Sequence, residues 1–385
     1  MTPPARVQTA IELLDWILNG VAPEKALTMW ARHNRYAGSK DRAAIRDLVY
    51  DALRRKRSCA ALGGGMTGRG LMLGLSKEQC LDTSEWFTGK GYGPTALSFK
   101  ESSLQPVLSR GERLDLPDWL LPHFDASLGM AAEPTALALR HRAPVMLRSN
   151  TIKCDRSTAL SALSSEQITG RSHALAKTAI EITQGARKIT ASAAFSSGLV
   201  ELQDAASQAV IEMIPATDSM RALDYCAGGG GKALALAALG LPIVDAWDVD
   251  AGRMKDIAKR AERAGAAINI LTQPVGLYDL VLCDVPCSGS GAWRRAPYGK
   301  WLLTSDRLKN LTRLQFKILH KAAPFVSPNG LLVYSTCSVL AAENMSNISQ
   351  FTAVSPEWEC CYSRQFLLSD GGDGFFTAHL KRADV

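Results

Sequence analysis

Hydrophobic and polar positions change their period twice along the chain. Between Val7 and Val21 apolar residues recur at the three- and four-residue spacing of an amphipathic helix, and a second such stretch runs from Ser39 to Leu53. Short segments joined by glycine and proline follow, which is typical of brief helices and turns. We therefore expect residues 1–142 to form an all-helical region with its connector.

Short strands and helices alternate in the next part of the chain, residues 143–215. The expected strands cover 145–150, 179–182 and 199–202, and the expected helices cover 158–165 and 205–214. This pattern predicts a small α+β subdomain that is like an RNA-recognition motif.

From residue 216 to 385 a regular alternation of strand and helix sets in. The expected strands are 222–226, 243–250, 268–271, 278–283 and 331–334, with helices at 251–264 and 305–325 and a turn at 327–330. Such alternation predicts an α/β, doubly wound (Rossmann-like) domain with a largely parallel sheet.

Two cysteines follow buried strands of this domain. Cys287 stands in the sequence Asp-Val-Pro-Cys that begins at Asp284, and Cys337 stands in Thr-Cys-Ser. Side chains at the carboxyl ends of parallel strands line the ligand crevice, so both thiols are expected to face one pocket.

A glycine-rich loop follows the strand that begins at residue 222. Glycines let a ligand approach the backbone, and the N–H groups at a helix start bind polar or anionic groups. The candidate cofactor-binding residues of this loop are Cys226, Ala227, Gly228, Gly229, Gly230, Gly231 and Lys232. After the next strand an acid can accept hydrogen bonds from ribose hydroxyls, with Asp248 preferred and Asp250 second. Ala233 after Lys232 argues against a nucleotide-triphosphate loop.

Composition and charge narrow the class of protein. The net charge is +7, with eleven Lys and Arg against six Asp and Glu in residues 1–57, and eight against two in residues 284–321. Two basic clusters favour a nucleic-acid partner. Because no apolar run approaches the length of a membrane span and the nine cysteines lack paired spacing, we expect a cytoplasmic, reduced protein without membrane association or metal.

Four motifs resemble, in order and spacing, those of the RNA cytosine-5 methyltransferases of the Sun (Fmu) family. They are LDYCAGGGGK from Leu223, CDVPCSGSG from Cys283, KW at Lys300, and YSTCSVLAAEN from Tyr334. The resemblance implies a class I methyltransferase that uses S-adenosylmethionine and a covalent cysteine–cytosine intermediate. The helical start looks like the RNA-binding domain of members that act on small-subunit ribosomal RNA.

The resemblance also implies roles for individual residues. Cys337 would be the nucleophile, Cys287 would assist proton removal and product release, and Asp284 would contact both the base edge and the methyl donor. Residue types alone leave the choice between the two thiols open. Further contacts are expected from Lys232 to the donor or base, and from Arg294, Arg295 and Lys300 to RNA phosphates.

The chain departs from the family pattern at its donor loop. Gly228 and Gly229 stand where the family has Ala and Pro, and losing Pro raises the entropy cost of ordering the loop. No acid follows the third strand, where Gln273 could offer an amide, and Gly299 replaces the acid before Lys-Trp. These changes leave open a catalytically inactive, RNA-binding ribosome-assembly factor, and a nicotinamide-dependent oxidoreductase is the remaining alternative. We expect a monomer.

Overall fold

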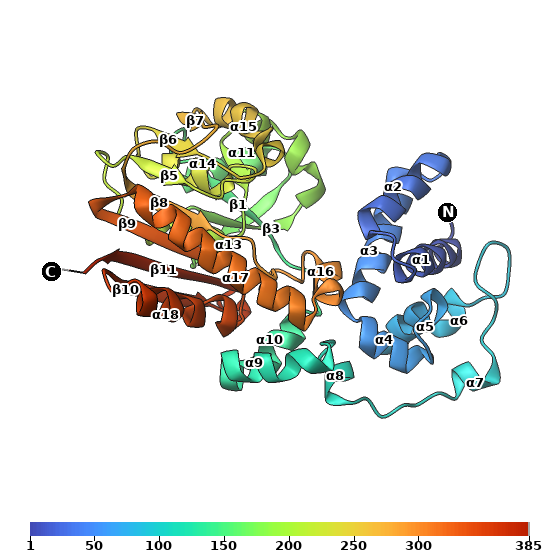
Figure 1. Ribbon diagram of the computed structural model, residues 1–385. Helices are drawn as coiled ribbons and strands as arrows, with labels where there is room; N and C mark the ends of the chain where they lie inside the picture. Colours follow the sequence, from blue (N-terminus) through green and yellow to red (C-terminus); the bar gives the residue numbers. More distant parts are fainter. Residues whose placement is uncertain (384–385) are drawn as a thin grey trace. The chain divides into compact units, whose positions relative to one another are not determined.

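The computed structural model describes residues 1–383 and divides into two compact units (Figure 1). The first unit contains Met1–Asp125, Gly129–Arg142 and the distant segment Trp293–Leu302. The second contains Ala126–Leu128, Ala143–Ala292 and the chain from Leu303 onward.

Helices make up the first unit. In chain order they include α1 (Pro3–Leu18), α2 (Pro23–His33), α3 (Ser39–Arg54), α4 (Lys56–Gly63), α5 (Gly68–Glu78), α6 (Thr83–Trp86), α7 (Phe99–Ser102), α8 (Arg110–Arg113), α10 (Ala132–Ala138) and α16 (Pro297–Leu302), while α9 (Leu121–Leu128) begins in this unit. Apolar residues at helical spacing on α1, α3 and α5, such as Leu14, Val49 and Leu71, are fully buried in one core. The hydrophobic spacing in the sequence therefore reports the packed faces of these helices.

The segment Trp293–Leu302 completes the first unit although it lies far along the chain. Tyr298 packs against the helical core. Trp301 Nε1 donates to the carbonyl of Leu53 at 2.7 Å, and Lys300 Nζ donates to the carbonyl of Arg54 at 3.1 Å. These donors satisfy carbonyls in the last turn of α3, which have no partner within the helix itself.

Two sheets organise the second unit. The smaller sheet is antiparallel, in the order β2 (Thr169–Ser172), β3 (Ala179–Gln184), β1 (Val145–Ser149) and β4 (Val200–Leu202). Helices α11 (Arg156–Ser165), α12 (Ala193–Ser196) and α13 (Ala205–Glu212) accompany it. The expected α+β segment is thus present, with β2 as an additional strand.

The larger sheet has seven strands in the order β10 (Trp358–Phe366), β11 (Phe375–Arg382), β9 (Val326–Thr336), β8 (Tyr278–Asp284), β5 (Ala222–Asp224), β6 (Val244–Ala246) and β7 (Ile268–Ile270). The five strands from β9 to β7 are parallel, and β10 and β11 are antiparallel. Its helices are α14 (Gly231–Ala238), α15 (Ile257–Ala264), α17 (Ser305–Ala322) and α18 (Met345–Val354). The expected doubly wound α/β fold is confirmed.

Three local predictions differ from the structure. Residues 327–330 do not separate two elements, because β9 begins at Val326 and absorbs them as an irregularity between the pairs Tyr278↔Val326 and Leu280↔Leu331. The helix expected at 251–264 is a 3-10 turn (Ala251–Met254) followed by α15. Strands β10 and β11 were not anticipated. Among the described residues no helix is long and apolar enough to cross a bilayer.

Candidate functional site

The carboxyl ends of four neighbouring strands carry the expected site residues. Following the order β9, β8, β5, β6, these ends lead to Cys337, then to Asp284 and Cys287, then to the glycine loop, and then to Asp248. Parallel strands bring such ends to one edge of the sheet, so residues scattered over more than a hundred positions share it.

The two thiols are in contact. Cys287 Sγ and Cys337 Sγ lie 3.3 Å apart, and each residue is partly exposed. Thr336 and Ser338, which flank Cys337, are fully buried. The sulfur atoms are therefore reachable while the backbone that carries Cys337 is fixed.

A buried carboxylate joins the two loops that carry the thiols. Glu343 Oε1 accepts from the backbone N–H of Ser288 at 2.8 Å, and its Oε2 accepts from the hydroxyl of Ser338 at 2.6 Å. The Ser288 hydroxyl also donates to Oε2. Gln315 of α17 donates to Glu343 Oε1 and to the carbonyl of Pro286, both at 3.0 Å. The residues on each side of Cys287 and one neighbour of Cys337 are thus fixed by one network.

Asn344 fixes the other loop from both sides. Its Oδ1 accepts from the Thr336 hydroxyl at 2.6 Å, and its Nδ2 donates to the carbonyl of Ser338 at 2.9 Å. Both partners are the immediate chain neighbours of Cys337. Glu343 and Asn344 belong to the sequence motif that begins at Tyr334, but only the folded loops show what they bind.

The environment of Cys287 favours its protonated form. The hydrogen bond with Cys337, burial, and the negative charge of Glu343 together raise the pKa of the Cys287 thiol well above its ordinary value. A thiol that keeps its proton is a poor nucleophile, because the thiolate is the reactive species. The surroundings of Cys287 therefore do not favour it as the attacking sulfur.

Asp284 and Lys232 form an ion pair beside the thiol-bearing loops. Lys232 Nζ lies 2.7 Å from Asp284 Oδ2, and the Ser335 hydroxyl donates to Asp284 Oδ1 at 3.0 Å. Lys232 is buried, with its ammonium 4.8 Å from the centre of the Phe375 ring. Because Asp284 remains one-third exposed, it can still present oxygen to a ligand.

The glycine loop borders a cavity of about 240 Å³. Gly228 and Gly230 have φ angles of 49° and 79°, a conformation that strains residues with a side chain. The lining residues are Gln203, Ser207, Asp224, Cys226, Ala227, Gly228, Gly229, Gly231, Lys232, Arg253, Arg260 and Asp284. All the expected loop residues except Gly230 therefore line one hollow, together with Asp284.

Asp248 is placed differently from the expected ribose acceptor. Its Oδ2 accepts from the Gly228 N–H at 2.9 Å and lies 3.0 Å from Arg253 Nη1, and the residue is only 4% exposed. In this structure Asp248 supports the glycine loop and is absent from the cavity lining. Asp250 is exposed and accepts from the Gly252 N–H at 2.9 Å.

Sequence reasoning assigned no role to Asp224, which lines the same cavity. The residue is 1% exposed, and neither carboxylate oxygen has a hydrogen-bond partner of ordinary geometry among the described residues, although the backbone N–H groups of Cys226 and Ala233 lie close enough to lower its pKa slightly. Burial and the nearby charge of Asp284 raise the pKa of Asp224 to about 7. Its position at the carboxyl end of β5 was the signal available in the sequence. A buried, unpaired carboxyl group beside a cavity is suited to a cationic ligand group.

The expected phosphate contacts are only partly compatible with the structure. Lys300 is 1% exposed and directs its ammonium to the carbonyl of Arg54 and over the Trp301 ring, so in this structure the ammonium is not presented to an outside phosphate. Burial lowers the pKa of Lys300 to about 8. Arg294 is also buried, at 7% exposed, whereas Arg295 is exposed. All three belong to the first unit.

Metal ligation has no candidate in the part of the chain that is described. Residues 1–383 contain no group of three or more His, Cys, Asp or Glu side chains placed to hold an ion.

Comparison with known proteins identifies the family. A model described as 16S rRNA methyltransferase RsmB/F matches residues 211–381, and one described as the RsmF/B-like ferredoxin-like domain matches residues 116–189. Ribosomal RNA small subunit methyltransferase B of Citrobacter koseri is 31% identical over 300 residues, which cover 73% of this chain and 70% of that protein. The chain belongs to the RsmB/F family of rRNA methyltransferases. The Sun-family resemblance is thereby confirmed.

A further relative is similar in sequence, and two solved structures share the fold. The methyltransferase B of Photorhabdus laumondii is 29% identical over 284 residues, 69% of this chain, and the match spans about two thirds (66%) of that protein's length. The crystal structure of PH0851 covers 99% of each chain with a TM-score of 0.76 at 21% identity. The structure of NSun6 from Pyrococcus horikoshii covers 70% of this chain and 99% of its own, with a TM-score of 0.63 at 15% identity.

Proposed function

We propose that this RsmB/F-family chain transfers a methyl group from S-adenosylmethionine to carbon 5 of a cytidine in small-subunit ribosomal RNA. The observation that carries the proposal is the 3.3 Å contact between Cys287 and Cys337 at the edge of the sheet that also holds the glycine loop. Cytosine-5 chemistry requires a thiolate beside a methyl donor, because carbon 5 is a poor nucleophile until a thiolate adds to carbon 6. A second thiol in contact with the first can then assist release of the product.

The steps follow from the two sulfurs. The Cys337 thiolate adds to carbon 6 of the cytosine, and the electron pair of the carbon 5–carbon 6 double bond attacks the methyl group that the bound sulfonium donor supplies. Transfer of the carbon 5 proton to water or another base then restores the double bond and expels the Cys337 thiolate. Cys287, which is in contact with Cys337 and keeps its proton, is the thiol suited to donate a proton to the departing sulfur and so assist release.

Asp284 and Lys232 are suited to hold the base. A carboxyl oxygen of Asp284 can accept from the exocyclic amine, and charge that develops on the ring as the thiolate adds is stabilised by groups already fixed in place. The 2.7 Å ion pair with Lys232 and the Ser335 hydrogen bond provide that fixation.

The residues around the 240 Å³ cavity fit the methyl donor. S-adenosylmethionine carries an ammonium group, which would satisfy the two unpaired oxygens of Asp224. The NSun6 structure from Pyrococcus horikoshii was determined with SFG, an analogue of this donor, which supports the assignment by fold. The bound donor would supply the electrophilic methyl group, and the residues of this chain would orient the donor and the cytosine.

Asp224→Asn should weaken donor binding by about tenfold or more, since a charge-assisted hydrogen bond is lost. With a folded-state pKa of about 7, Asp224 ionises as pH rises from 6 to 8. Binding of a cation favours the ionised form, so the wild-type affinity should rise by about tenfold over that range. Titration calorimetry at several pH values measures both effects.

The Asp224→Asn variant also provides the control. The donor's own amino group also titrates when the variant is used. The ionisation of Asp224 is therefore measured by the difference between the affinity–pH profiles of the wild type and the variant. The raised pKa means that ionisation at pH 8 destabilises the folded state, so Asp224→Asn should unfold at a higher temperature than the wild type at that pH. Equal affinities, or parallel pH profiles, would refute the assignment.

Bisulfite sequencing of ribosomal RNA from cells with and without this protein tests the reaction. One cytidine of the small-subunit RNA should resist conversion only when the protein is present, and purified protein with S-adenosylmethionine should restore that resistance in vitro. Absence of any such position would contradict the proposal.

The alternative, an inactive assembly factor that keeps the fold, is favoured by the altered glycine loop and by the arginines that border it. Arg260 Nη1 donates to the Gly229 carbonyl, and Arg253 pairs with Asp248 at 3.0 Å. Calorimetry separates the two functions, because an inactive factor should bind no S-adenosylmethionine even at millimolar concentration.

A further inference from the structure

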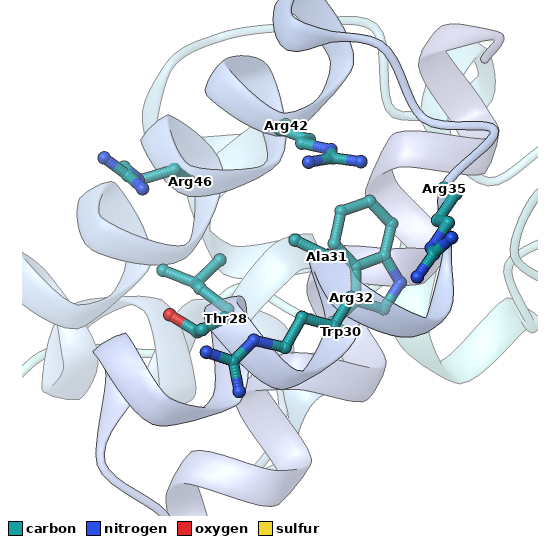
Figure 2. A pocket seen from close by; sticks show the side chains of 8 residues that line it. Thr28, Trp30, Ala31, Arg32, Arg35, Arg42 and Arg46 are labelled. Atoms are coloured by element: carbon teal, nitrogen blue, oxygen red, sulfur yellow. The ribbon is translucent and has the colours of Figure 1, made fainter.

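Arginines border a cavity in each of the two units, but they differ in how deeply they are buried. In the first unit four arginines border a cavity, and none of them is buried (Figure 2); they are Arg32, Arg35, Arg42 and Arg46. Water can therefore solvate their charges. In the second unit Arg148 borders a cavity of about 340 Å³, the Arg148 cavity, and is only 3% exposed. A charge buried to this extent is costly unless a partner compensates it.

Arg148 has no ion-pair partner within residues 1–383. Its Nε donates to the side-chain oxygen of Gln203 at 2.8 Å, while its Nη1 is buried and has no hydrogen-bond partner. Glu201 lies opposite Arg148 on β4, but its carboxylate is already shared by Arg260 at 3.5 Å and Arg263 at 2.6 Å. Burial lowers the pKa of Arg148 to about 10, so the guanidinium is still charged at neutral pH. An excess of positive charge therefore remains at Arg148.

The other two charged residues of the Arg148 cavity cancel one another. Lys177 and Glu212 both line it, and the backbone N–H of Lys177 donates to Glu212 Oε2 at 2.8 Å. The N–H of Thr178 donates to Glu212 Oε1 at 3.0 Å, so the backbone before β3 holds this carboxylate in place. The lining thus carries one net positive charge. A ligand with a single negative charge matches this balance better than a dianion does.

Apolar side chains supply another part of the lining. Ile211 comes from α13, Ala235 and Ala238 come from α14, and Leu239 follows α14 directly. A ligand that pairs with Arg148 would therefore place its remaining atoms against apolar surface, where burial of each methylene group is favourable. The cavity volume lies within the range of sites that bind small molecules.

We propose that the Arg148 cavity binds a small organic monocarboxylate, whose carboxylate pairs with Arg148 and whose aliphatic chain packs against residues of α13 and α14. Guanidinium and carboxylate groups form paired, charge-assisted hydrogen bonds, and such a partner offsets the cost of a buried, unpaired charge. The Arg148 cavity shares no lining residue with the 240 Å³ cavity assigned to the methyl donor, the donor cavity. The proposal therefore goes beyond the proposed function.

A chain of hydrogen bonds connects the two cavities. Gln203 accepts from Arg148, lines the donor cavity, and donates from Nε2 to the carbonyl of Gly231 at 3.3 Å. Helix α14 also reaches both, with Gly231 at the donor cavity and Ala235 at the Arg148 cavity. Because a carboxylate at Arg148 neutralises positive charge close to the site of a cationic donor, it should tighten donor binding. This coupling rests on the proposed function, whereas the carboxylate site does not.

Titration calorimetry of the full-length chain with sodium hexanoate tests the site. The wild type should bind one equivalent, and binding should tighten roughly fourfold for each methylene added from butyrate to hexanoate. Arg148→Met keeps an unbranched side chain and removes the charge, so it should weaken hexanoate binding by about tenfold or more. Because the lost guanidinium has no ion pair, the variant should unfold at a temperature no lower than that of the wild type.

A second variant tests the cavity without changing Arg148. Ala238→Leu adds atoms to the lining at a half-buried position near the end of α14. It should weaken binding of hexanoate and leave binding of acetate unchanged, because only the longer chain needs the occupied space. Hexanoate binding equal to that of the wild type in both Arg148→Met and Ala238→Leu would overturn the proposal.

Lys255→Met is the matched control for loss of a positive charge. Lys255 is exposed, belongs to the same unit, and is absent from the lining of both cavities. This variant should bind hexanoate as the wild type does. Phosphate, and dimethyl phosphate, which carries the phosphodiester group of RNA, should each bind at least tenfold more weakly than hexanoate. Tighter binding of either phosphate, or an equal loss of hexanoate affinity in Lys255→Met and Arg148→Met, would refute the carboxylate site.

Donor titrations with and without saturating hexanoate test the coupling. The affinity for S-adenosylmethionine should rise by about threefold in the wild type and stay constant in Arg148→Met, and the donor should tighten hexanoate binding by the same factor. Unchanged donor affinity would exclude the coupling. If the wild type binds hexanoate but no S-adenosylmethionine, the site stands and the proposed function is wrong. If it binds the donor but no hexanoate, the site is wrong and the proposed function stands.

Discussion

Cys337→Ala should abolish methyl transfer, lowering the rate by about four orders of magnitude or more, because the attacking sulfur is lost. No covalent protein–RNA species should form. Cys287→Ala should have a different outcome, since Cys337 can still add to carbon 6 while release of the product fails. An adduct stable to denaturing gel electrophoresis should accumulate with this variant. Gel mobility of labelled RNA and release of labelled S-adenosylhomocysteine measure the two effects.

Cys283→Ala supplies the control for removing a thiol. Cys283 is fully buried in β8, four residues before Cys287, and burial raises its pKa far from the reactive range. The variant should keep most activity and form no trapped adduct. Accumulation of the adduct in Cys337→Ala rather than in Cys287→Ala would reverse the roles of the two sulfurs.

Glu343→Gln should lower kcat by about two to three orders of magnitude with little change in KM for RNA. The carboxylate accepts from the Ser288 N–H and hydroxyl and from the Ser338 hydroxyl, and an amide cannot accept from all of them. Two charge-assisted hydrogen bonds would be lost or inverted, each contributing about 1.5–3 kcal/mol. The sulfurs would then lose their relative placement, although Glu343 itself is a positioning residue.

The pH profile distinguishes this role from a purely structural one. The negative charge of Glu343 contributes to the raised pKa of Cys287, so its neutralisation should lower that pKa. Cys287 would then lose its proton at a lower pH, and the alkaline limb of the activity profile should move in the same direction. The variant Glu343→Asp keeps the negative charge, so it should move the alkaline limb of the activity profile part of the way back to its wild-type position.

Asp245→Asn is the matched control for loss of a buried carboxylate from the same unit. Asp245 on β6 accepts from Tyr278 and Arg221, both at 2.9 Å. The variant should lose stability and retain the pH profile of the wild type. If it shifted the alkaline limb as Glu343→Gln does, a specific role for Glu343 would be excluded.

The fold was predictable from sequence wherever hydrophobic periodicity was strong. The α/β core, β5 through β9, and the helical start follow from spacing alone. Strand β10 was missed because it is largely exposed and lacks a continuous apolar run, for example at Glu359 and Arg364. Strand β11 is mostly buried, but the polar residues Thr377 and His379 interrupt its apolar run. Residues 327–330 misled the prediction because Pro and Gly usually end a strand, whereas here the parallel neighbour β8 holds the irregular segment.

The sequence predicted which residues belong to the candidate site better than it predicted what those residues contact. Motif spacing placed Cys287 and Cys337 in one pocket, and the structure brings their sulfurs to 3.3 Å. Spacing could not show that Asp248 supports the glycine loop, nor that Lys300 is buried, because both depend on partners distant in sequence. The same limitation hid Glu343, whose bonds reach 55 residues back to Ser288.

The segment Trp293–Leu302 has a consequence for how the protein is made. Most of the helical unit precedes residue 143, yet the donors for the Leu53 and Arg54 carbonyls come from Trp301 and Lys300. Translation must therefore pass through the smaller sheet and most of the parallel strands before these two bonds can form. A nascent chain stopped at residue 142 would leave the end of α3 uncapped.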